Sequence, residues 1–378
     1  MTTSALTARR IFDGETLRTG QAILVSRSVV EAIVNLHDLP EGAAVRDFGD
    51  AILSPGFVDV QVNGGGGVLF NDAPSKAAVE TITSAHRAYG TAALLPTLIT
   101  DTPDVTRQAI DAAIEAENNG VEGFAGLHLE GPHLSVKRHG AHDPGLIRPM
   151  NDDDLHMLLS AKDRLRTLVS TVAPESVTES QIRALAKAGI IVSLGHSDCS
   201  YDTAMRCFDA GATMVTHLFN AMSQLSNREP GLVGAALASG AVSAGLIADG
   251  FHVHAASMAA ALRAKAGPGD VFLVTDAMST VGSDLAEFTL KGRRILREGG
   301  RLTLEDGTLA GADIDMLSCV RNAHRMLGLP LEAALAMATS APAKAIRRPE
   351  LGRIRPGERV SLIALTPDLS AVEHVKLA

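Results

Sequence analysis

Short apolar runs alternate with amphipathic segments through the middle of the chain. Most neighbouring runs are separated by a segment of helical length, such as residues 76–90, 104–119, 178–190, 201–212 and 254–267. Strands that alternate with helices predict a parallel sheet, and eight of them predict a closed (β/α)8 barrel. The expected barrel strands are residues 56–62, 92–99, 124–130, 168–174, 190–196, 213–218, 243–249 and 271–277.

The two ends of the chain carry a different pattern, of short strand-like runs and turns without helices. Neither end is long enough to bury a core alone, so residues 1–53 and 346–378 are expected to form one small β-sandwich domain together. The barrel domain then covers residues 54–345. Residues 286–310 interrupt its pattern and predict a β-hairpin insertion after the eighth strand.

Composition and charge narrow the class of protein. The 378 residues carry a net charge of −9 with both signs mixed, and no block of Lys or Arg suggests nucleic-acid binding. An anionic ligand would therefore need local positive groups. Three cysteines argue against a disulfide framework and for a reducing compartment. No signal-peptide-like or membrane-spanning run is evident, so the expected location is the cytoplasm, with no membrane partner.

Polar side chains gather where the expected strands end. In this fold the site lies at the carboxyl ends of the strands. The strand-end residues are Gln61, Asn63, His128, Glu130, His196, His217, Asp249 and Asp276. Two histidines and one glutamate are a known catalytic zinc set with a fourth position open for water, and an aspartate nearby can accept the water proton. The alternative at this point is structural: a strand-end histidine often only hydrogen-bonds, and a carboxylate often caps the next helix.

The first expected strand, in VDVQVNGGGG at residues 58–67, departs from a common pattern. Metal-dependent hydrolases on this barrel often end that strand with two histidines one residue apart. Here Gln61 and Asn63 occupy those positions, and neutral amides are weak ligands by comparison. Either the metal has been lost or fewer ligands are needed.

Seven motifs then occur in order: PGFVDVQVNG, HLEGPHL, LGHSD, THLFNAM, NREPGLVG, ADGFHV and VTDAMS. Together they resemble the amidohydrolase superfamily and, within it, the N-acetylglucosamine-6-phosphate deacetylase family, over residues 52–320 and into both terminal segments. The combination of HLEGP, THLFNAM and ADGFHV is specific. The resemblance implies hydrolysis of the acetamide of N-acetylglucosamine 6-phosphate, in amino-sugar catabolism and cell-wall recycling.

The resemblance also implies roles for single residues. Glu130, His196 and His217 match metal ligands, Asp276 matches the catalytic aspartate, and His142 matches a catalytic histidine that contacts the amide carbonyl. The positions expected to bind substrate are Gln61, Ala141, His142, Asn220, Ala221, Arg228, Asp249, His252, Leu309, Ala310 and Gly311.

Three groups of these positions have more defined partners. Asn220 and Ala221 match contacts to the sugar, Arg228 and His252 match a phosphate-binding pair, and residues 309–311 match a loop that lines the sugar pocket. A purely structural role for the neighbouring Asp249 and His252 stays open. The family forms homodimers in which the arginine reaches the phosphate held by the neighbouring chain.

The resemblance also resolves the question raised by the first strand. Since the ligands on strands three, five and six are present, the chain is expected to bind one divalent ion, most suitably zinc, although imidazole and carboxylate also suit iron and others. Gln61 is then expected to hydrogen-bond the water at the metal. Cys199 could approach the metal, but a free buried thiol is the simpler expectation.

Three other functions are alternatives to this deacetylase activity. Deacetylation of N-acetylgalactosamine 6-phosphate is a closely related activity, and the sequence alone distinguishes the two substrates poorly. A cyclic-amide hydrolase of the dihydroorotase or hydantoinase type would need a bridging carboxylated lysine, where the third and fourth strand ends offer only Glu130. A protein that merely binds the sugar phosphate would have no use for a proton acceptor at Asp276.

Overall fold

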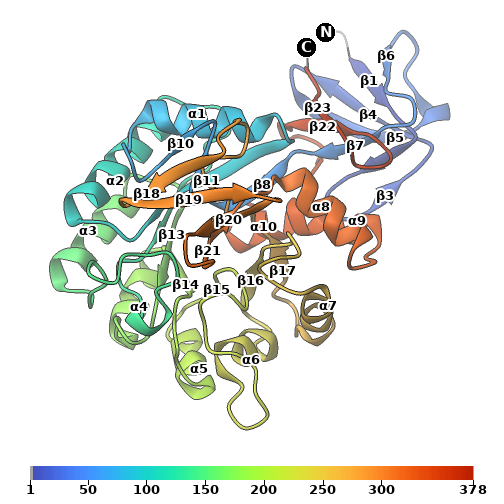
Figure 1. Ribbon diagram of the computed structural model, residues 1–378. Coiled ribbons are helices and arrows are strands. Elements are labelled where there is room, and N and C mark those ends of the chain that lie inside the picture. Colours follow the sequence, from blue (N-terminus) through green and yellow to red (C-terminus); the bar gives the residue numbers. More distant parts are fainter. Residues whose placement is uncertain (1–2, 378) are drawn as a thin grey trace.

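The computed structural model describes residues 3–377 and contains an eight-stranded parallel sheet whose strands follow one another in chain order (Figure 1). The sheet closes on itself where Val62 bridges Ala277 and where the Asp276 amide donates to the Gln61 carbonyl at 3.0 Å. The predicted eight-stranded barrel is therefore confirmed. Its strands are β8 (Phe57–Val62), β11 (Thr91–Ile99), β12 (Leu127–Glu130), β13 (Leu168–Val172), β14 (Ile191–Leu194), β15 (Met214–Val215), β16 (Ser243–Leu246) and β17 (Val271–Leu273).

Helices connect the barrel strands and cover their outer face (Figure 1). Several begin where the sequence supplies an oxygen for the first free amides: Ser75 accepts from Ala78, and Thr178 forms a reciprocal capping box with Gln181. Among residues 3–377 no helix is both long and apolar enough to cross a membrane. The helices are α1 (Lys76–Arg87), α2 (Pro103–Asn118), α3 (Asp152–Lys162), α4 (Glu179–Lys187), α5 (Tyr201–Asp209), α6 (Gly231–Ala238), α7 (Ala255–Ala264), α8 (Met316–Arg325), α9 (Leu331–Ala338) and α10 (Ser340–Ala345), with short 3₁₀ turns η1 (Leu36–Asp38) and η2 (Val136–Arg138).

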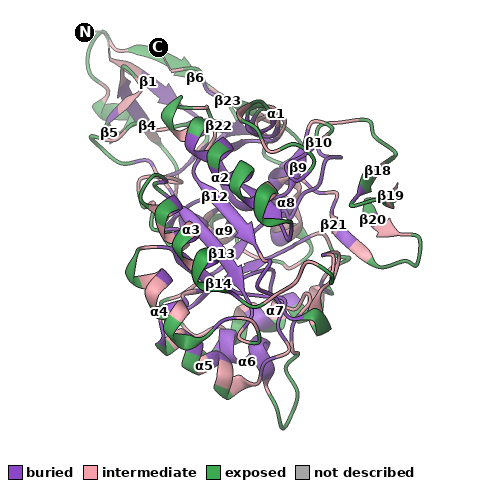
Figure 2. Cartoon of the chain, turned by 90° about the vertical axis from the view of Figure 1, so that its left-hand side faces the viewer, coloured by how far each residue is buried: buried purple, intermediate pink, exposed green. Residues whose placement is uncertain are grey.

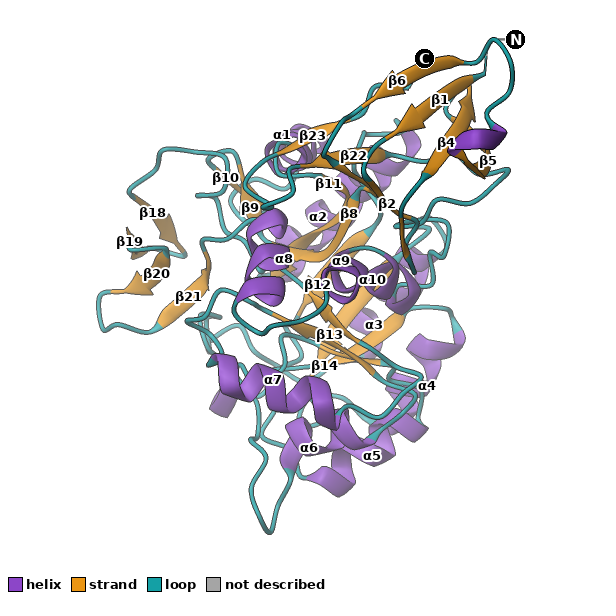
Figure 3. Ribbon diagram, turned by 90° about the vertical axis from the view of Figure 1, so that its right-hand side faces the viewer, coloured by secondary structure: helices purple, strands orange, loops and turns teal. Residues whose placement is uncertain are grey.

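The two ends of the chain meet in a pair of sheets beside the barrel (Figures 1 and 3). One sheet has the order β5-β4-β1-β6 and the other β23-β22-β7-β2-β3, so strands from the C-terminal end extend a sheet begun by the N-terminal end. Leu6, Ile23, Leu53 and Leu362 belong to one buried apolar cluster. The strands are β1 (Ser4–Thr7), β2 (Arg10–Phe12), β3 (Leu17–Arg18), β4 (Gln21–Ser26), β5 (Val29–Asn35), β6 (Ala44–Asp47), β7 (Ile52–Pro55), β22 (Leu362–Leu365) and β23 (Val372–His374). The division into domains at residues 53/54 and 345/346 stays a proposal.

After β17 the chain forms an antiparallel sheet that stands out from the barrel, as Figures 2 and 3 show. We call residues 287–312 the flap. It has four strands, two more than a single hairpin: β18 (Glu287–Leu290), β19 (Arg293–Glu298), β20 (Arg301–Leu304) and β21 (Leu309–Ala312). Figure 2 shows flap strands that mix exposed, intermediate and buried residues, beside barrel strands that are almost entirely buried. The flap nevertheless has a small apolar core, in which Leu290 and Ile295 pack with Ile99 and Met278 of the barrel.

A small strand pair, β9 (Gly64–Gly65) and β10 (Val68–Leu69), follows β8 in the glycine-rich segment. The amides of Gly64 and Gly67 donate to carbonyls of Ala277 and Ser279 at 3.1 and 2.9 Å. The first and last barrel strands are therefore joined again just beyond their carboxyl ends.

Candidate active site

A cavity of about 240 Å³ lies at the carboxyl ends of the barrel strands and reaches the flap. Loops from several strands meet there, as expected for this fold. Its lining residues are Asn63, Ile99, Glu130, Gly140, Ala141, His142, His196, His217, Asn220, Ala221, His252, Asp276, Met278, Leu290, Thr308, Leu309 and Gly311.

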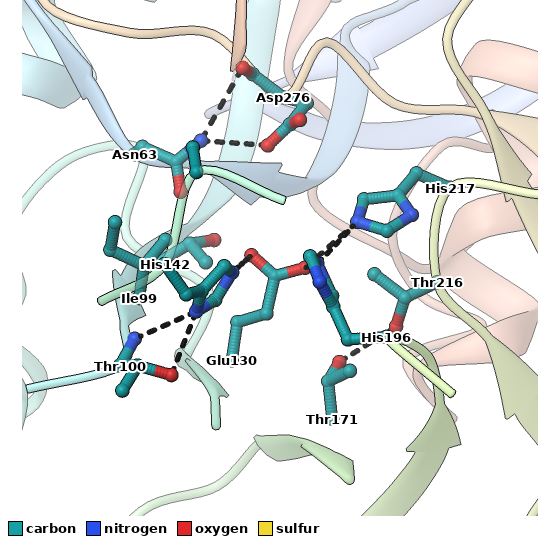
Figure 4. Close-up of polar contacts among 12 residues, drawn as sticks. Asn63, Ile99, Thr100, Glu130, His142, Thr171, His196, Thr216, His217 and Asp276 are labelled. Carbon is teal, nitrogen blue, oxygen red and sulfur yellow. Dashed lines mark hydrogen bonds and ion pairs between the residues drawn. The ribbon is translucent and has the colours of Figure 1, made fainter. Parts of the chain in front are cut away.

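Three donor atoms from residues that line this cavity form a tight triangle (Figure 4). Glu130 Oε1 lies 3.0 Å from His217 Nε2 and 3.3 Å from His196 Nε2, and the two Nε2 atoms are 3.0 Å apart. Ligands bound tetrahedrally to zinc at 2.0–2.1 Å are separated by about 3.3 Å. The spacing of these atoms therefore fits one divalent ion held between them.

The electrostatics of the triangle favour positive charge. Burial alone would raise the pKa of Glu130, but hydrogen bonds and charge from His196 and His217 outweigh it and hold that pKa well below its usual value. Burial likewise opposes protonation of His217, yet the bond and charge of Glu130 raise the pKa of that imidazole. A site that stabilises an extra proton in this way also suits a metal cation.

The imidazole of His196 is oriented for ligation. Its Nδ1 lies 2.8 Å from the Arg138 carbonyl, which can only accept a hydrogen bond, so Nδ1 carries a proton. Nε2 is thereby directed at the triangle, where it donates to Glu130 when protonated and offers its lone pair to a metal ion when not. The Nδ1 atom of His217 is buried and has no hydrogen-bond partner among residues 3–377.

The backbone turns sharply at three of these side chains. The strands β14, β15 and β17 end two or three residues before His196, His217 and Asp276, whose φ angles are 48°, 27° and 52°. Residues other than glycine seldom adopt positive φ, and such strained positions cluster at functional sites. Here the turns direct all three side chains toward the cavity (Figure 4).

Asp276 is linked to Glu130 through the amides of the first strand. Gln61 Nε2 donates to Asp276 Oδ1 and to Glu130 Oε1, both at 3.1 Å, and Asn63 Nδ2 donates to Asp276 Oδ1 at 2.7 Å. Burial and the charge of Glu130 raise the pKa of Asp276 to about 6. A carboxylate with such a pKa can accept and return a proton near neutral pH.

His142 is fixed in the opposite tautomer to His196. Its Nδ1 accepts from the backbone amide of Thr100 at 3.2 Å and contacts Thr100 Oγ1 at 2.7 Å. The ring proton therefore sits on Nε2, which faces Glu130 Oε2 at 3.8 Å. Burial and the neighbouring His196 hold the pKa of His142 well below its usual value, so the ring is a neutral donor. Donor atoms of Glu130, His142 and His196 lie within 4.8 Å of one another.

The other predicted substrate-binding residues fall into two groups. Ala141, Asn220, Ala221, His252, Leu309 and Gly311 line the cavity. Gln61 and Ala310 are buried but do not line the cavity, and Asp249 is half-buried with its side chain 4% exposed. Arg228 is exposed on the loop between β15 and α6 and does not line the cavity of its own chain.

His252 and Asp249 form a buried pair. His252 Nδ1 lies 2.6 Å from Asp249 Oδ2, with side chains only 8% and 4% exposed. Burial would raise the pKa of Asp249, but the bond and charge of His252 and two backbone amides lower it. The carboxylate thus fixes the ring and leaves Nε2 free to serve the cavity.

Sequence reasoning did not single out Thr100, Met278, Leu290 or Thr308. Thr100 immediately follows β11, so the rule that polar residues at strand ends serve the site would have pointed to it. Leu290 and Thr308 come from opposite ends of the flap, and no local pattern indicates that they meet at one cavity.

Comparison with known proteins agrees with the fold and with the family resemblance. Residues 52–376 match the model of the amidohydrolase family. The chain is 46% identical to the N-acetylgalactosamine-6-phosphate deacetylase of Shewanella sp. (strain ANA-3), over 84% of this chain and 79% of the relative. It is 35% identical to the N-acetylglucosamine-6-phosphate deacetylase of Haemophilus influenzae, over 94% and 93%. The crystal structure of N-acetylglucosamine-6-phosphate deacetylase from Pasteurella multocida superposes with a TM-score of 0.94 at 34% identity, covering 99% of this chain and 98% of that one.

Proposed function

Because this chain belongs to the amidohydrolase family, we propose that it hydrolyses the acetamide of N-acetyl-D-glucosamine 6-phosphate to acetate and D-glucosamine 6-phosphate. The main support for this proposal is that the side chains of Glu130, His196, His217 and Asp276 all line one cavity. Three close donors and one carboxylate with a raised pKa are what metal-assisted amide hydrolysis requires.

Glu130, His196 and His217 are the proposed ligands of one divalent ion, and zinc suits them best. His142 is also close, but a ring nitrogen that carries a proton cannot bind a metal, and Thr100 holds that proton on Nε2. The amide nitrogens of Gln61 and Asn63 are turned toward carboxylates. When bound, a divalent ion supplies Lewis acidity, which lowers the pKa of water from about 15.7 toward about 7.

Asp276 and His142 divide the proton chemistry between them. The Asp276 carboxylate accepts the proton of the attacking water and then delivers it to the amine, because an amide nitrogen leaves poorly as an anion. The Nε2–H of His142 donates to the carbonyl oxygen as negative charge develops on it. Gln61 and Asn63 hold Asp276 in place by donating to it.

The phosphate is assigned to His252 and to Arg228 of a second subunit. The net charge of −9 gives no general attraction for an anion, so particular cations must supply it. Arg228 is exposed and absent from the lining of its own cavity. A homodimer in which this loop reaches the neighbouring cavity would bring its planar guanidinium to the phosphate oxygens.

Deacetylation of N-acetylgalactosamine 6-phosphate is the second candidate, favoured by the 46% identity to an enzyme named for that substrate. The two sugars differ only in the configuration of one hydroxyl, at C4. We propose that the protein is located in the cytoplasm. Cys199, Cys207 and Cys319 are all buried free thiols, which a reducing compartment allows.

Acetate release from four substrates tests the function. N-acetylglucosamine 6-phosphate, its galacto epimer and both sugars without phosphate are compared at equal concentration with metal-loaded protein. We expect the highest kcat/KM on N-acetylglucosamine 6-phosphate and far lower values without phosphate. Faster turnover of the galacto epimer would establish the second candidate, and no acetate from any of the four would overturn both.

A further inference from the structure

The turn between β18 and β19 carries two cationic side chains toward the barrel. Lys291 and Gly292 have φ angles of 51° and 76°, which is the conformation of the tight hairpin turns that match strand twist. The Lys291 ammonium pairs with the Asp101 carboxylate, and the Arg293 guanidinium donates to the Ala141 carbonyl.

Both contacts fall beside the residues that hold His142. Asp101 follows Thr100, whose amide and hydroxyl meet His142 Nδ1, and Ala141 immediately precedes His142. The flap turn therefore contacts both the segment that carries His142 and the segment whose Thr100 meets its Nδ1.

The segment that contains Asp101 is held by several contacts. Asp101 is buried, with its side chain 2% exposed, and it also accepts from the Thr102 amide at 2.8 Å and from Asn71 Nδ2 at 2.9 Å. The Ala141 side is a loop without regular secondary structure, formed by residues 139–143. The position of His142 Nε2 consequently depends on how well this loop is held.

We propose that Arg293 is a positioning residue for His142: by holding the Ala141 carbonyl it fixes the Nε2–H donor relative to the amide of the substrate. The catalytic part of the proposal rests on the proposed deacetylation. Removing an oxyanion donor costs about 100- to 1,000-fold in kcat, and misplacing a catalytic group by about 1 Å costs about 100-fold. We therefore expect Arg293→Ala to lower kcat by about 10- to 100-fold and to change KM much less.

The next residue of β19 is a matched control. Arg294 pairs with Glu287 on the outer face of the flap, and these two side chains are 54% and 50% exposed. Arg294→Ala removes the same kind of side chain from the same strand and leaves Ala141 untouched, so it reports any general weakening of the flap.

Hydrogen–deuterium exchange tests the positioning without any substrate. A peptide that covers residues 139–146 should exchange faster in Arg293→Ala than in wild type or Arg294→Ala, and Arg293→Lys should restore part of the protection. If exchange in this peptide is the same in Arg293→Ala and Arg294→Ala, Arg293 does not hold the loop and the proposal is wrong.

A double-mutant cycle with His142→Ala tests the catalytic consequence. If Arg293 acts through His142, adding Arg293→Ala to His142→Ala should cause little further loss of kcat. Losses that multiply would contradict the proposal, as would a loss confined to phosphorylated sugars, which would mean that Arg293 binds the phosphate. If wild-type protein releases no acetate from any of the four sugars, the proposed function fails, and the exchange experiment still decides the positioning.

Discussion

Glu130 and Asp276 lie in the same buried site, share the amide of Gln61, and have pKa values shifted in opposite directions. Hydrogen bonds and charge from two histidines outweigh burial and keep Glu130 ionised, whereas burial and the charge of Glu130 raise the pKa of Asp276 to about 6. Pairs of titratable groups whose surroundings separate their pKa values commonly divide the acid and base roles. Here one carboxylate is suited to hold a cation and the other to exchange a proton.

Replacing Asp276 with asparagine tests the second role. Asp276→Asn keeps the size of the side chain but removes the base, so kcat should fall by about 100- to 10,000-fold, the usual range for a general acid–base group. Metal content, measured by elemental analysis, should be nearly unchanged, because Asp276 is outside the ligand triangle. Wild-type turnover in the variant would show that Asp276 does not take the proton.

The pKa of Asp276 also sets the pH dependence of turnover. The carboxylate acts as a base only when ionised, so kcat/KM should rise with pH along an acid limb whose midpoint is at or below a pH of about 6. A bound cation favours the ionised form and moves this limb to lower pH. A profile measured from about pH 4.5 to about 8 should show the limb in wild type and not in the residual activity of Asp276→Asn. Greater activity at the acid end than at neutral pH would contradict the assignment.

Among the barrel strands, the end of β12 depends on a close approach to the end of β11. Gly131 follows Glu130 with a φ of 89°, and a Cβ atom there would overlap Thr100 Oγ1, the group that holds His142. This glycine is needed for both its conformation and its small size.

Gly131→Ala should therefore lower both stability and turnover. The left-handed backbone costs an alanine about 1–2 kcal/mol, and the overlap with Thr100 adds about 1–3 kcal/mol. Gly120→Ala is the control, since Gly120 has a φ of 61° but open space around it. Urea unfolding should give a larger loss for Gly131→Ala than for Gly120→Ala, and only Gly131→Ala should reduce kcat. Equal losses of stability would mean that the overlap is relieved elsewhere.

The alternation of apolar runs and amphipathic segments was enough to predict the barrel, but not the directions in which the side chains of the site point. Eight apolar runs located the strands, because each buried strand is a continuous apolar stretch. His196, His217 and Asp276 lie beyond shortened strands, and their positive φ angles leave no trace in a hydrophobic pattern. The contact of Arg293 with Ala141 joins segments about 150 residues apart, so only the folded chain brings it about. The roles proposed for Arg228 and His252 came from the family resemblance and not from periodicity.

For the whole molecule, we propose that a second subunit completes the site. The chain is acidic overall, and Arg228 extends into solvent from a loop beyond the barrel. The proposed homodimer would explain why a cation expected at the phosphate does not line the cavity of its own chain.

Mixed dimers distinguish whether Arg228 acts on the active site of the neighbouring chain or on that of its own chain. Take one chain with Arg228→Ala and another with Asp276→Asn, each nearly inactive alone. A mixed dimer has one site with an intact Asp276 and an intact partner Arg228, and one site that lacks both. Purified heterodimers should recover about half of wild-type activity, the share expected when distant, independent sites do not interact. Heterodimers as inactive as either parent would show that Arg228 does not act across the interface.

A zinc titration of turnover tests whether the protein is a deacetylase that needs one metal ion per chain. Protein stripped of metal is supplied with increasing zinc, and acetate release from N-acetylglucosamine 6-phosphate is measured at each step. Since three protein ligands form one triangle and the first strand offers only amides, the rate should rise in proportion to zinc and level off at one ion per chain. A rate that levels off only at two ions per chain would rule out the single-metal site, and no acetate at any zinc level would rule out the deacetylase.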